Sequence, residues 1–133
     1  MNAFICEIKN LPGEQARVTE ALAARKINVV NCCVGIGDQG VLGLVVNDET
    51  GTRSVLTDTG VSFVEVPCIT IKMQDKPGQT ARISRTLADA GVNIDLFLPI
   101  GIGTKEPIVA LGVDDIDGAR KVLKSDIVEF NYS

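Results

Sequence analysis

The strongest constraint in this 133-residue sequence is an internal duplication. The segment NLPGEQARVTEALAARKINVVN, which begins at Asn10, aligns with DKPGQTARISRTLADAGVNIDL, which begins at Asp75. After a slip of one or two residues the match resumes, and GTRSVL falls on GARKVL. A period of roughly 65 residues is longer than that of solenoid repeats. The sequence therefore predicts one small domain that occurs twice, as residues 1–66 and 67–133.

Each half of the chain has the pattern strand, helix, strand, strand, helix, strand. Apolar residues alternate in FICEIK and in ITIKM, as expected for half-buried strands. An apolar stripe predicts a first helix at about residues 14–25 and 79–90, and second helices are expected at about 50–57 and 115–124. The strands VSFVEV and IVEFNY are expected to close the halves. We therefore expect an α+β fold of two tandem ferredoxin-like βαββαβ units, each an antiparallel sheet with helices on one face.

A glycine run formed by Gly35, Gly37 and Gly40 has the G-x-G-x-x-G spacing of a dinucleotide-binding turn. Such a turn must open a helix, because the helix N-terminus holds the pyrophosphate. Here the run precedes VLGLVV, a predicted strand, and its counterpart GIGTKE in the second half also lies between two strands. We interpret both segments as hairpin connections in which glycine supplies a positive φ. No nucleotide cofactor is expected.

The composition disfavours several classes of function. A net charge of −4 opposes contact with a nucleic-acid phosphate backbone, and no run of about 18 apolar residues is present to span a membrane. The start MNAFICEIKN lacks the pattern of a signal peptide, so a cytoplasmic location is expected. The chain has no histidine, so zinc, haem and histidine-dependent catalysis lack their commonest ligand or base.

The cysteines and one acidic cluster have structural interpretations. Cys6, Cys32, Cys33 and Cys68 show no C-x-x-C spacing, and we expect them to be small buried apolar residues. A redox-active pair of the two adjacent cysteines is the alternative. Acidic residues at 114, 115 and 117 suggest calcium, but no glutamate follows at the EF-hand spacing. We expect them to start a helix, and we expect no metal site.

The motifs of both repeats resemble the ACT domain, a βαββαβ regulatory module that binds amino acids. The second half is especially similar to the regulatory repeats of aspartate kinases. The resemblance rests on Asp75-Lys76-Pro77-Gly78, Ala81-Arg82-Ile83, Leu87 and Gly91-Val92-Asn93-Ile94, with weaker counterparts in Asn10-Leu11-Pro12-Gly13 and Lys26-Ile27-Asn28-Val29. Because the repeats cover nearly the whole chain, the resemblance implies a stand-alone tandem ACT protein with no catalytic domain.

The resemblance implies ligand binding near the turn between first strand and first helix, at an interface between two ACT units. The physical reason is that this turn ends at a helix N-terminus, whose free N–H groups attract a carboxylate. Asp75 is expected to accept from an α-ammonium group, and the amides of Asn28 and Asn93 both donate and accept. The expected ligand-binding residues are Asn10, Leu11, Pro12, Gly13, Glu14, Gln15, Asn28 and Val29 in the first half and Asp75, Lys76, Pro77, Gly78, Gln79, Thr80, Asn93 and Ile94 in the second.

Structural interpretations of these residues stay open beside the functional one. Glu14-Gln15 and Gln79-Thr80 are polar where the family often has apolar residues, so they set side-chain specificity or are only first-turn residues. A Pro-Gly pair before a helix is also a tight turn, and an asparagine after a helix is also a cap. We interpret Arg17 and Arg82, which repeat on the first helices, as solvated or interface charges. The ligands of aspartate kinases are not assumed, because DLFLPIG lacks the polar run seen in many of their repeats.

Three classes of function compete. The leading hypothesis is a sensor, in which a free amino acid alters association of this protein with itself or with a metabolic enzyme. The second is a ligand-free interaction module, or a regulatory subunit that docks on an amino-acid biosynthetic enzyme. An enzyme is the weakest hypothesis. The second strands, with Cys32-Cys33-Val34 and Leu96-Phe97-Leu98, are apolar without alternation, which predicts that both faces are covered and favours a homodimer through second-strand and sheet-face contacts.

Overall fold

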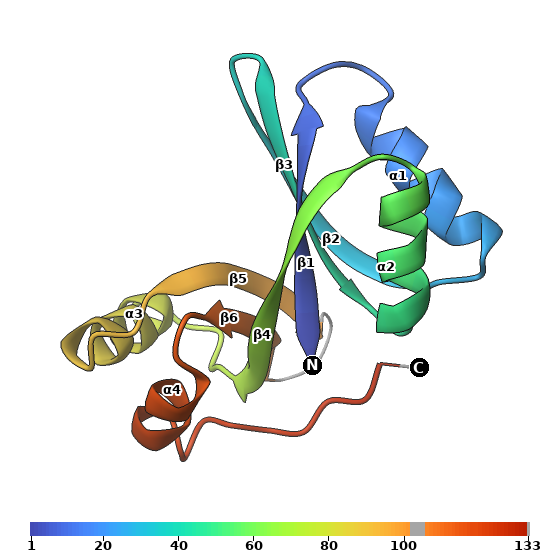
Figure 1. Ribbon diagram of the computed structural model, residues 1–133. Helices are drawn as coiled ribbons and strands as arrows, with labels where there is room; N and C mark the ends of the chain where they lie inside the picture. Colours follow the sequence, from blue (N-terminus) through green and yellow to red (C-terminus); the bar gives the residue numbers. More distant parts are fainter. Residues whose placement is uncertain (102–105, 133) are drawn as a thin grey trace. The chain divides into compact units, whose positions relative to one another are not determined.

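The computed structural model describes residues 1–101 and 106–132 (Figure 1). The chain divides into two compact units. The N-terminal unit comprises Asn2–Glu65 with Tyr132, and the C-terminal unit comprises Met1 with Val66–Asn131. Within the described residues, no helix is long and apolar enough to cross a membrane.

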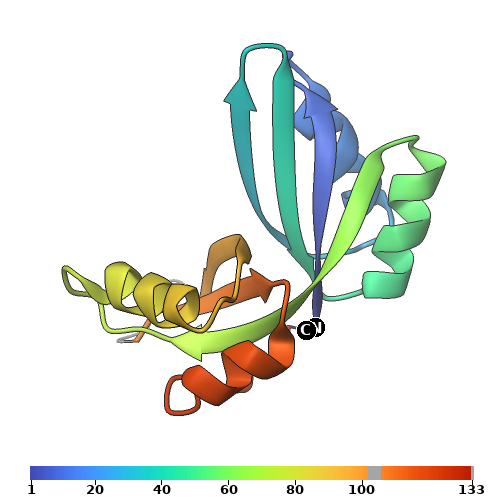
Figure 2. The same cartoon turned by 60° about the vertical axis from the view of Figure 1, so that its left-hand side comes forward.

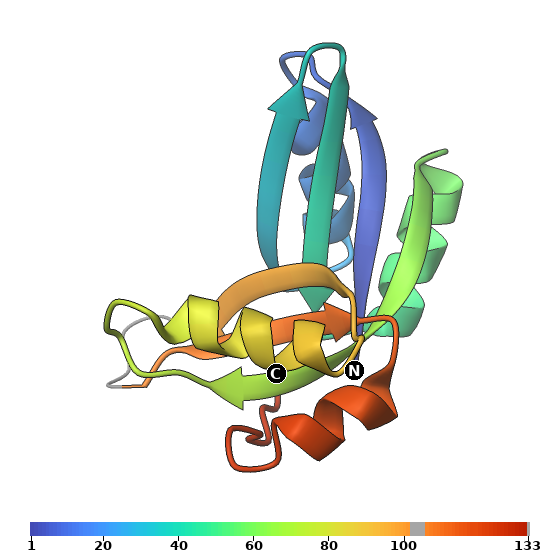
Figure 3. The ribbon, with the colours of Figure 1, turned by 90° about the vertical axis from the view of Figure 1, so that its left-hand side faces the viewer.

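The N-terminal unit is a sheet with two helices on one face (Figure 2). The strands lie in the order β2-β3-β1-β4, and β3 pairs antiparallel with both β1 and β2. Figure 3 shows β2, β3 and β1 side by side with α1 behind them. The elements are β1 (Asn2–Lys9), α1 (Glu14–Ala24), β2 (Val29–Ile36), β3 (Gln39–Val46), α2 (Glu49–Asp58) and the first residues of β4 (Ser62–Lys72).

The C-terminal unit repeats this arrangement with strand order β4-β6-β5. Strand β6 pairs antiparallel with both β4 and β5, and β5 is interrupted by register shifts between Ile94 and Leu96 and between Pro99 and Gly101. The further elements are α3 (Gln79–Asp89), β5 (Ile94–Gly101), β6 (Ile108–Val113) and α4 (Ile116–Val122). The two units together confirm the predicted α+β class of tandem ferredoxin-like units.

Each unit has its own apolar core between its sheet and its helices. The predicted alternation is confirmed, because Phe4, Cys6 and Ile8 are all buried and Ile69 and Ile71 occupy the same positions in the second core. The predicted helical stripes supply Val18 and Leu22 to the first core and Ile83 and Leu87 to the second. Burying side chains of this size contributes about 1.5–3 kcal/mol each, so the stripes determine which helix face meets the sheet.

The duplication extends to local hydrogen bonds. Asp48 caps α2 by accepting from the Gly51 N–H, and Asp115 caps α4 by accepting from the Gly118 N–H, each at 2.9 Å. Asp115 therefore starts a helix, as expected from the sequence, and satisfies an N–H group that has no partner within the helix. The N-cap residues of α1 and α3 are glycines in the left-handed conformation, with φ of 89° and 91°.

The prediction of a last strand at IVEFNY is wrong. The segment IVEFNY forms no regular strand; a single bridge joins Ile127 to Ile71, and the Val128 N–H donates to the Thr70 carbonyl at 3.0 Å. The alternation of this segment is weak, and of its residues only Ile127 packs against the second core. The strands VSFVEV and ITIKM are instead parts of one continuous strand, β4.

The first glycine run is a hairpin connection, as predicted. Strand β2 ends at Ile36, β3 begins at Gln39, and these two residues pair across the turn. Gly37 has a φ of 57°, the left-handed conformation that glycine adopts without strain. The counterpart GIGTKE falls mostly on residues 102–105, outside the described residues.

The prediction that both faces of the second strands are covered holds for β5 only in part, since Phe97 on the helix-facing side is partly buried, and it fails for the end of β2. Leu96 and Leu98 are buried, whereas Val34 and Ile36 are 57% and 80% exposed. Cys33 is exposed as well, so the expectation of four buried cysteines is wrong at that position; Cys32 is partly buried, and Cys6 and Cys68 are buried. The sequence pattern of a strand shows which residues share a face, because side chains alternate every two residues. It does not show whether that face is covered by another element or exposed to solvent.

Candidate functional site

A cavity of about 520 Å³ lies beside the turn between β4 and α3. We call residues 73–78 the C-terminal elbow. Strand β4 ends at Lys72, and α3 begins at Gln79, so the elbow joins the end of the strand to the start of the helix. The lining residues are Met73, Gln74, Asp75, Lys76, Gln79, Thr80, Phe97, Pro99, Gly101, Pro107 and Val109.

The cavity has a polar wall and an apolar wall. Elbow residues and the first turn of α3 supply a carboxylate, an ammonium, two amides and a hydroxyl, from Gln74, Asp75, Lys76, Gln79 and Thr80. Apart from Met73 in the elbow, the apolar residues come from the sheet and its connections, namely Phe97, Pro99, Pro107 and Val109. Such a cavity suits a small ligand that carries opposite charges at one end and hydrocarbon at the other.

The polar wall includes the N-terminus of α3, whose cap differs from the caps of α2 and α4. Gly78 is the N-cap and supplies no side-chain hydrogen bond. By contrast, Asp48 and Asp115 occupy the N-caps of α2 and α4 with their carboxylates. The first-turn N–H groups of α3 therefore lack a carboxylate cap, and together with the helix dipole they favour an anion at this position.

Four of the sequence-predicted residues, Asp75, Lys76, Gln79 and Thr80, are brought together around this cavity. Pro77 and Gly78 belong to the elbow but do not line the cavity, and Asn93 and Ile94 lie away from it. Asn93 and Ile94 follow the other end of α3, an 11-residue helix whose length is about 16 Å. Ile94 packs against the core. The Asn93 N–H donates to the Asp114 carboxylate at 2.8 Å, and its side-chain amide donates to Asp95 at 3.1 Å.

The asparagine of the N-terminal unit has the same surroundings. The Asn28 N–H donates to the side-chain oxygen of Asn47 at 2.9 Å, the counterpart of the bond between Asn93 and Asp114. Val29, the next residue, packs against the first core. Within each unit the structure therefore separates the asparagine from the elbow by the length of a helix, and it gives the backbone of the asparagine a structural bond.

The N-terminal elbow, residues 10–13, is bound to the β2–β3 hairpin through Asn10. The Asn10 side chain donates to the Gly37 carbonyl at 2.8 Å, and the Asn10 N–H donates to the Asp38 carbonyl at 3.1 Å. A Cβ atom at Gly35 would lie only 2.5 Å from the Asn10 side chain. In the C-terminal unit a Cβ atom at Gly101 would lie 3.0 Å from the Ile108 side chain. Asn10 thus fills the space between its elbow and the β2–β3 hairpin.

A smaller cavity of about 280 Å³ lies beside the N-terminal elbow. It is lined by Lys9, Leu11, Asp38 and Gln39, so Leu11 is its only predicted site residue. Pro12, Gly13 and Gln15 are exposed, and they do not line it. Glu14 is engaged locally, because its carboxylate accepts from the Lys9 N–H at 3.3 Å and from Arg17 at 3.0 Å. The hydrogen bond from Arg17 is the main cause that lowers the pKa of Glu14 below its ordinary value.

The repeated arginines have a structural role in both units. Arg17 donates to the Thr59 carbonyl at 3.1 Å, and Arg82 donates to the Asp126 carboxylate at 2.9 Å. In each unit the arginine of the first helix thus binds the turn that follows the second helix. The hydrogen bond to Asp126 raises the pKa of Arg82, so this guanidinium stays charged. Both arginines were interpreted as solvated or interface charges; each is partly exposed, and its guanidinium also binds a turn.

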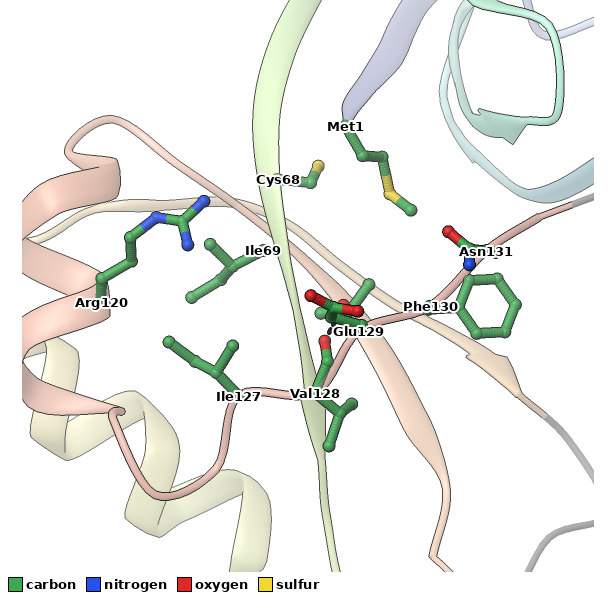
Figure 4. A pocket seen from close by; sticks show the side chains of 10 residues that line it. Met1, Cys68, Ile69, Arg120, Ile127, Val128, Glu129, Phe130 and Asn131 are labelled. Carbon is green, nitrogen blue, oxygen red and sulfur yellow. Dashed lines mark hydrogen bonds between the residues drawn. The ribbon is translucent and has the colours of Figure 1, made fainter.

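Two further cavities of about 390 Å³ lie in the C-terminal unit. One, on the other side of the C-terminal elbow, has alternating charges from Lys72, Lys76, Arg82, Glu106 and Asp126, of which the pairs Lys72–Glu106 and Arg82–Asp126 are ion pairs. The other lies between α4, β4 and the C-terminal segment (Figure 4). There the Thr70 hydroxyl donates to the Val128 carbonyl, which holds the segment against β4.

Sequence reasoning missed the apolar wall of the elbow cavity. Met73 and Phe97 were recognised only as alternating or apolar strand residues. The missing step was topological: in a βαβ unit the two strands run in the same direction, so β4 and β5 end at the same edge of the sheet, with β6 between them. Any apolar side chain there that faces the helices is a neighbour of the elbow.

Comparisons with known proteins find similarity to the ACT domain and to an aspartokinase. The family model of the ACT domain matches residues 69–98, the segment that contains the C-terminal elbow, α3 and part of β5. An aspartokinase of Corynebacterium glutamicum is 31% identical over an alignment of 85 residues that covers 61% of this chain. The chain spans only 20% of the length of that relative.

Solved structures extend the likeness over both units. A protein of Bacteroides thetaiotaomicron has a TM-score of 0.79 at 24% identity, covering 96% of this chain and 90% of its own. The ligand-free regulatory subunit of aspartate kinase from Thermus thermophilus has a TM-score of 0.64 at 19% identity, covering 93% and 90%. The fold of this chain, two units in tandem, is thus also the fold of a regulatory subunit of a metabolic enzyme.

Proposed function

We propose that this chain, which carries two ferredoxin-like ACT units in tandem, is a regulatory protein that binds a free amino acid. The proposal is supported mainly by the elbow cavity of the C-terminal unit, where a polar wall and an apolar wall face one space of about 520 Å³. The matched ACT segment, residues 69–98, contains all the residues of the polar wall. Binding would alter the association of the chain with itself or with a metabolic enzyme.

The polar wall offers a partner to each charged end of an amino acid. The α-carboxylate would accept hydrogen bonds from the first-turn N–H groups of α3 and from the Thr80 hydroxyl. The α-ammonium would donate to the Asp75 carboxylate. The side-chain amide of Gln79 both donates and accepts, so it is able to serve either end. Gly78 lets the ligand approach the backbone closely because it has no Cβ atom.

We propose one binding site per chain, at the C-terminal elbow. The N-terminal elbow has Asn10 across its opening, bonded to Gly37, and its carboxylate at Glu14 is already paired with Arg17. A ligand there would have to break these bonds first. Calorimetric titration of the full chain with the amino acid that binds should therefore give a stoichiometry near one per chain, and a value near two would contradict a closed first elbow.

The experiment that tests the proposed function is a melting screen against the twenty amino acids. A ligand present at 100 times its dissociation constant adds about 2.7 kcal/mol to the free energy of unfolding, which moves the midpoint by several degrees. Asp75→Asn should abolish most of the shift, because it removes the negative charge that pairs with the ammonium group. Asn93→Ala is the matched control, since Asn93 lies at the other end of α3. No shift with any amino acid would contradict the proposal.

A homodimer through the N-terminal unit is proposed as well. Val34 and Val41 pair across β2 and β3 and are 57% and 46% exposed, and Ile36 beyond them is 80% exposed. Their neighbours Leu42 and Leu44 are in the core, so these side chains lie on the opposite face of the sheet, away from the helices. Strand β2 is the last in the strand order of its unit, which leaves one edge available for pairing.

The same apolar stripe favours the second candidate function, docking on an amino-acid biosynthetic enzyme without a ligand. Sedimentation of the pure chain separates the two. A dimer that dissociates in Ile36→Lys supports self-association, and Val122→Lys, at an exposed position of α4, is the control. A chain that is monomeric alone and whose melting no amino acid shifts would favour docking on another protein.

A further inference from the structure

We propose that the elbow cavity of the C-terminal unit selects amino acids with an uncharged, apolar side chain, and that Met73 and Phe97 determine this preference. The inference rests on the proposed function and names the class of its ligand. It is carried by the chemistry of the wall opposite the polar elbow residues.

Among the described residues, the apolar wall carries no charged side chain. Phe97 and Val109 come from β5 and β6, Pro99 and Pro107 flank them, and Met73 closes the wall from the elbow. Phe97 pairs with Leu111 and Pro99 pairs with Val109, so these residues share the sheet face that meets the helices. A charged side chain placed against this wall would lose its hydration without gaining a partner, which is costly.

Burial differs among the wall residues in a way that fits a ligand contact. Val109 is 2% exposed and is part of the core itself. Met73 and Phe97 are only partly buried, although both pack against the core. An apolar side chain in the cavity would cover the part of these two residues that now faces water, and this burial stabilises binding by about 25 cal/mol per Å².

The N-terminal unit shows what the same space looks like when it is filled. Ile8 lies two residues before Asn10, as Met73 lies two residues before Asp75, and Ile8 is 7% exposed. A Cβ atom at Gly40 would lie 2.9 Å from the Ile8 side chain, so Ile8 packs directly on the backbone of β3. With Ile8 and Asn10 in place, the chain's own side chains occupy this region. In the C-terminal unit, an apolar side chain of a ligand would take that place.

Calorimetric titration of the full chain tests the inference. The probes are leucine, isoleucine, methionine and phenylalanine, compared with glycine, threonine, lysine and aspartate. We expect the best apolar ligand to bind at least tenfold more tightly than every member of the second group, since a single methylene in an apolar pocket changes affinity by about tenfold or more. Lysine, threonine, aspartate or glycine as the tightest ligand would overturn the inference and leave the proposed function standing.

Two variants test the contributions of the apolar wall and the polar wall separately. Met73→Gln keeps the size of the side chain but places an amide in the apolar wall, so it should weaken the best apolar ligand about fivefold or more and narrow its advantage over threonine. Asp75→Asn should weaken all amino acids by a similar factor and leave their ranking unchanged. Val64→Gln, at an exposed position of β4 away from the cavity lining, is the control for an added amide.

Phe97→Leu provides a second, milder change to the same wall, because it shortens the side chain without adding polarity. It should increase the affinity for phenylalanine relative to valine, since the cavity becomes deeper. Melting without ligand establishes that each variant is folded. Unchanged ratios of affinity between the ligands in folded Met73→Gln and Phe97→Leu would overturn the assignment of these residues. A chain that binds no amino acid at all would overturn both this inference and the proposed function.

Discussion

The side-chain amide of Asn10 donates a 2.8 Å hydrogen bond to the carbonyl oxygen of Gly37, which joins the first elbow to the tip of the β2–β3 hairpin. This bond requires a glycine at position 35, because a Cβ atom there would lie 2.5 Å from the Asn10 side chain. The corresponding residue of the second elbow, Asp75, lines an open cavity instead. The same repeat position therefore holds an asparagine that binds a hairpin in the first elbow and a carboxylate that lines a cavity in the second.

Gly35→Ala should lower the free energy of unfolding by about 1–3 kcal/mol, because the new methyl group displaces Asn10 and leaves it without its acceptor. The measurement is urea unfolding of the full chain. Asn10→Ala removes the obstacle, so the double variant should lose less than the sum of the single changes. Strict additivity would contradict the contact between these two residues.

Lys26 is the only non-glycine residue with a positive φ in the described part of the chain, at 57°, and its counterpart Gly91 has a φ of 71°. Both residues follow the end of a first helix, where glycine is favoured because it has no Cβ penalty. Lys26→Gly should therefore raise the free energy of unfolding by about 0.5–1 kcal/mol.

Gly91→Ala is the matched reverse change, and it should lower the free energy of unfolding by about 1 kcal/mol. No atom lies within 4 Å of a Cβ atom placed at Gly91, so the cost comes from the backbone and not from a clash. Thermal and urea unfolding measure both variants. A destabilised Lys26→Gly would contradict the prediction and indicate that the lysine side chain has a stabilising contact.

Arg53 donates two hydrogen bonds to Glu65, at 2.6 and 2.8 Å, and these bonds hold the pKa of Glu65 below its ordinary value of 4.5. Because the folded-state pKa is the lower one, the pair stabilises the fold above pH 4.5 and this stabilisation is lost as the pH falls through the folded-state pKa. The difference in unfolding free energy between wild type and Glu65→Gln should therefore shrink from pH 7 to pH 3. A difference that stays constant over this range would contradict the pairing.

Thiol reactivity should follow burial. Burial raises the pKa of Cys6 to about 11, so this thiol is protonated and protected at neutral pH. Cys33 is exposed, and Cys32 is partly buried. Alkylation of the native chain by iodoacetamide, followed by mass spectrometry, should label Cys33 first and Cys6 only after unfolding. Rapid labelling of Cys6 would contradict the packing of the first core.

Most of the fold could be predicted from the sequence because the evidence is local and occurs twice. The alternation in FICEIK and ITIKM and the stripes of the first helices both appear in the structure. The last strand could not be predicted, since a short apolar segment such as IVEFNY becomes a strand only where a partner edge pairs along its whole length. Ile127 alone forms a bridge.

The candidate site was predictable only on its polar side. The residues Asp75, Lys76, Gln79 and Thr80 are neighbours in the sequence, and the structure places all four beside one cavity. The asparagines looked equivalent by motif, yet a helix separates them from the elbow of their own unit. A helix rises 1.5 Å per residue, so the length of the first helix already indicates that the asparagine after it lies far from the elbow before it.

The sequence by itself determined that one βαββαβ unit occurs twice, because backbone sterics and the periods of 2 and 3.6 residues act over a few neighbouring positions. The tertiary structure alone decided that the first elbow is closed by Asn10 and that the second opens onto an apolar wall at Phe97. These outcomes depend on strand register, which brings together side chains that are distant in the chain, and a shift of one residue would turn each of them to the other face of the sheet.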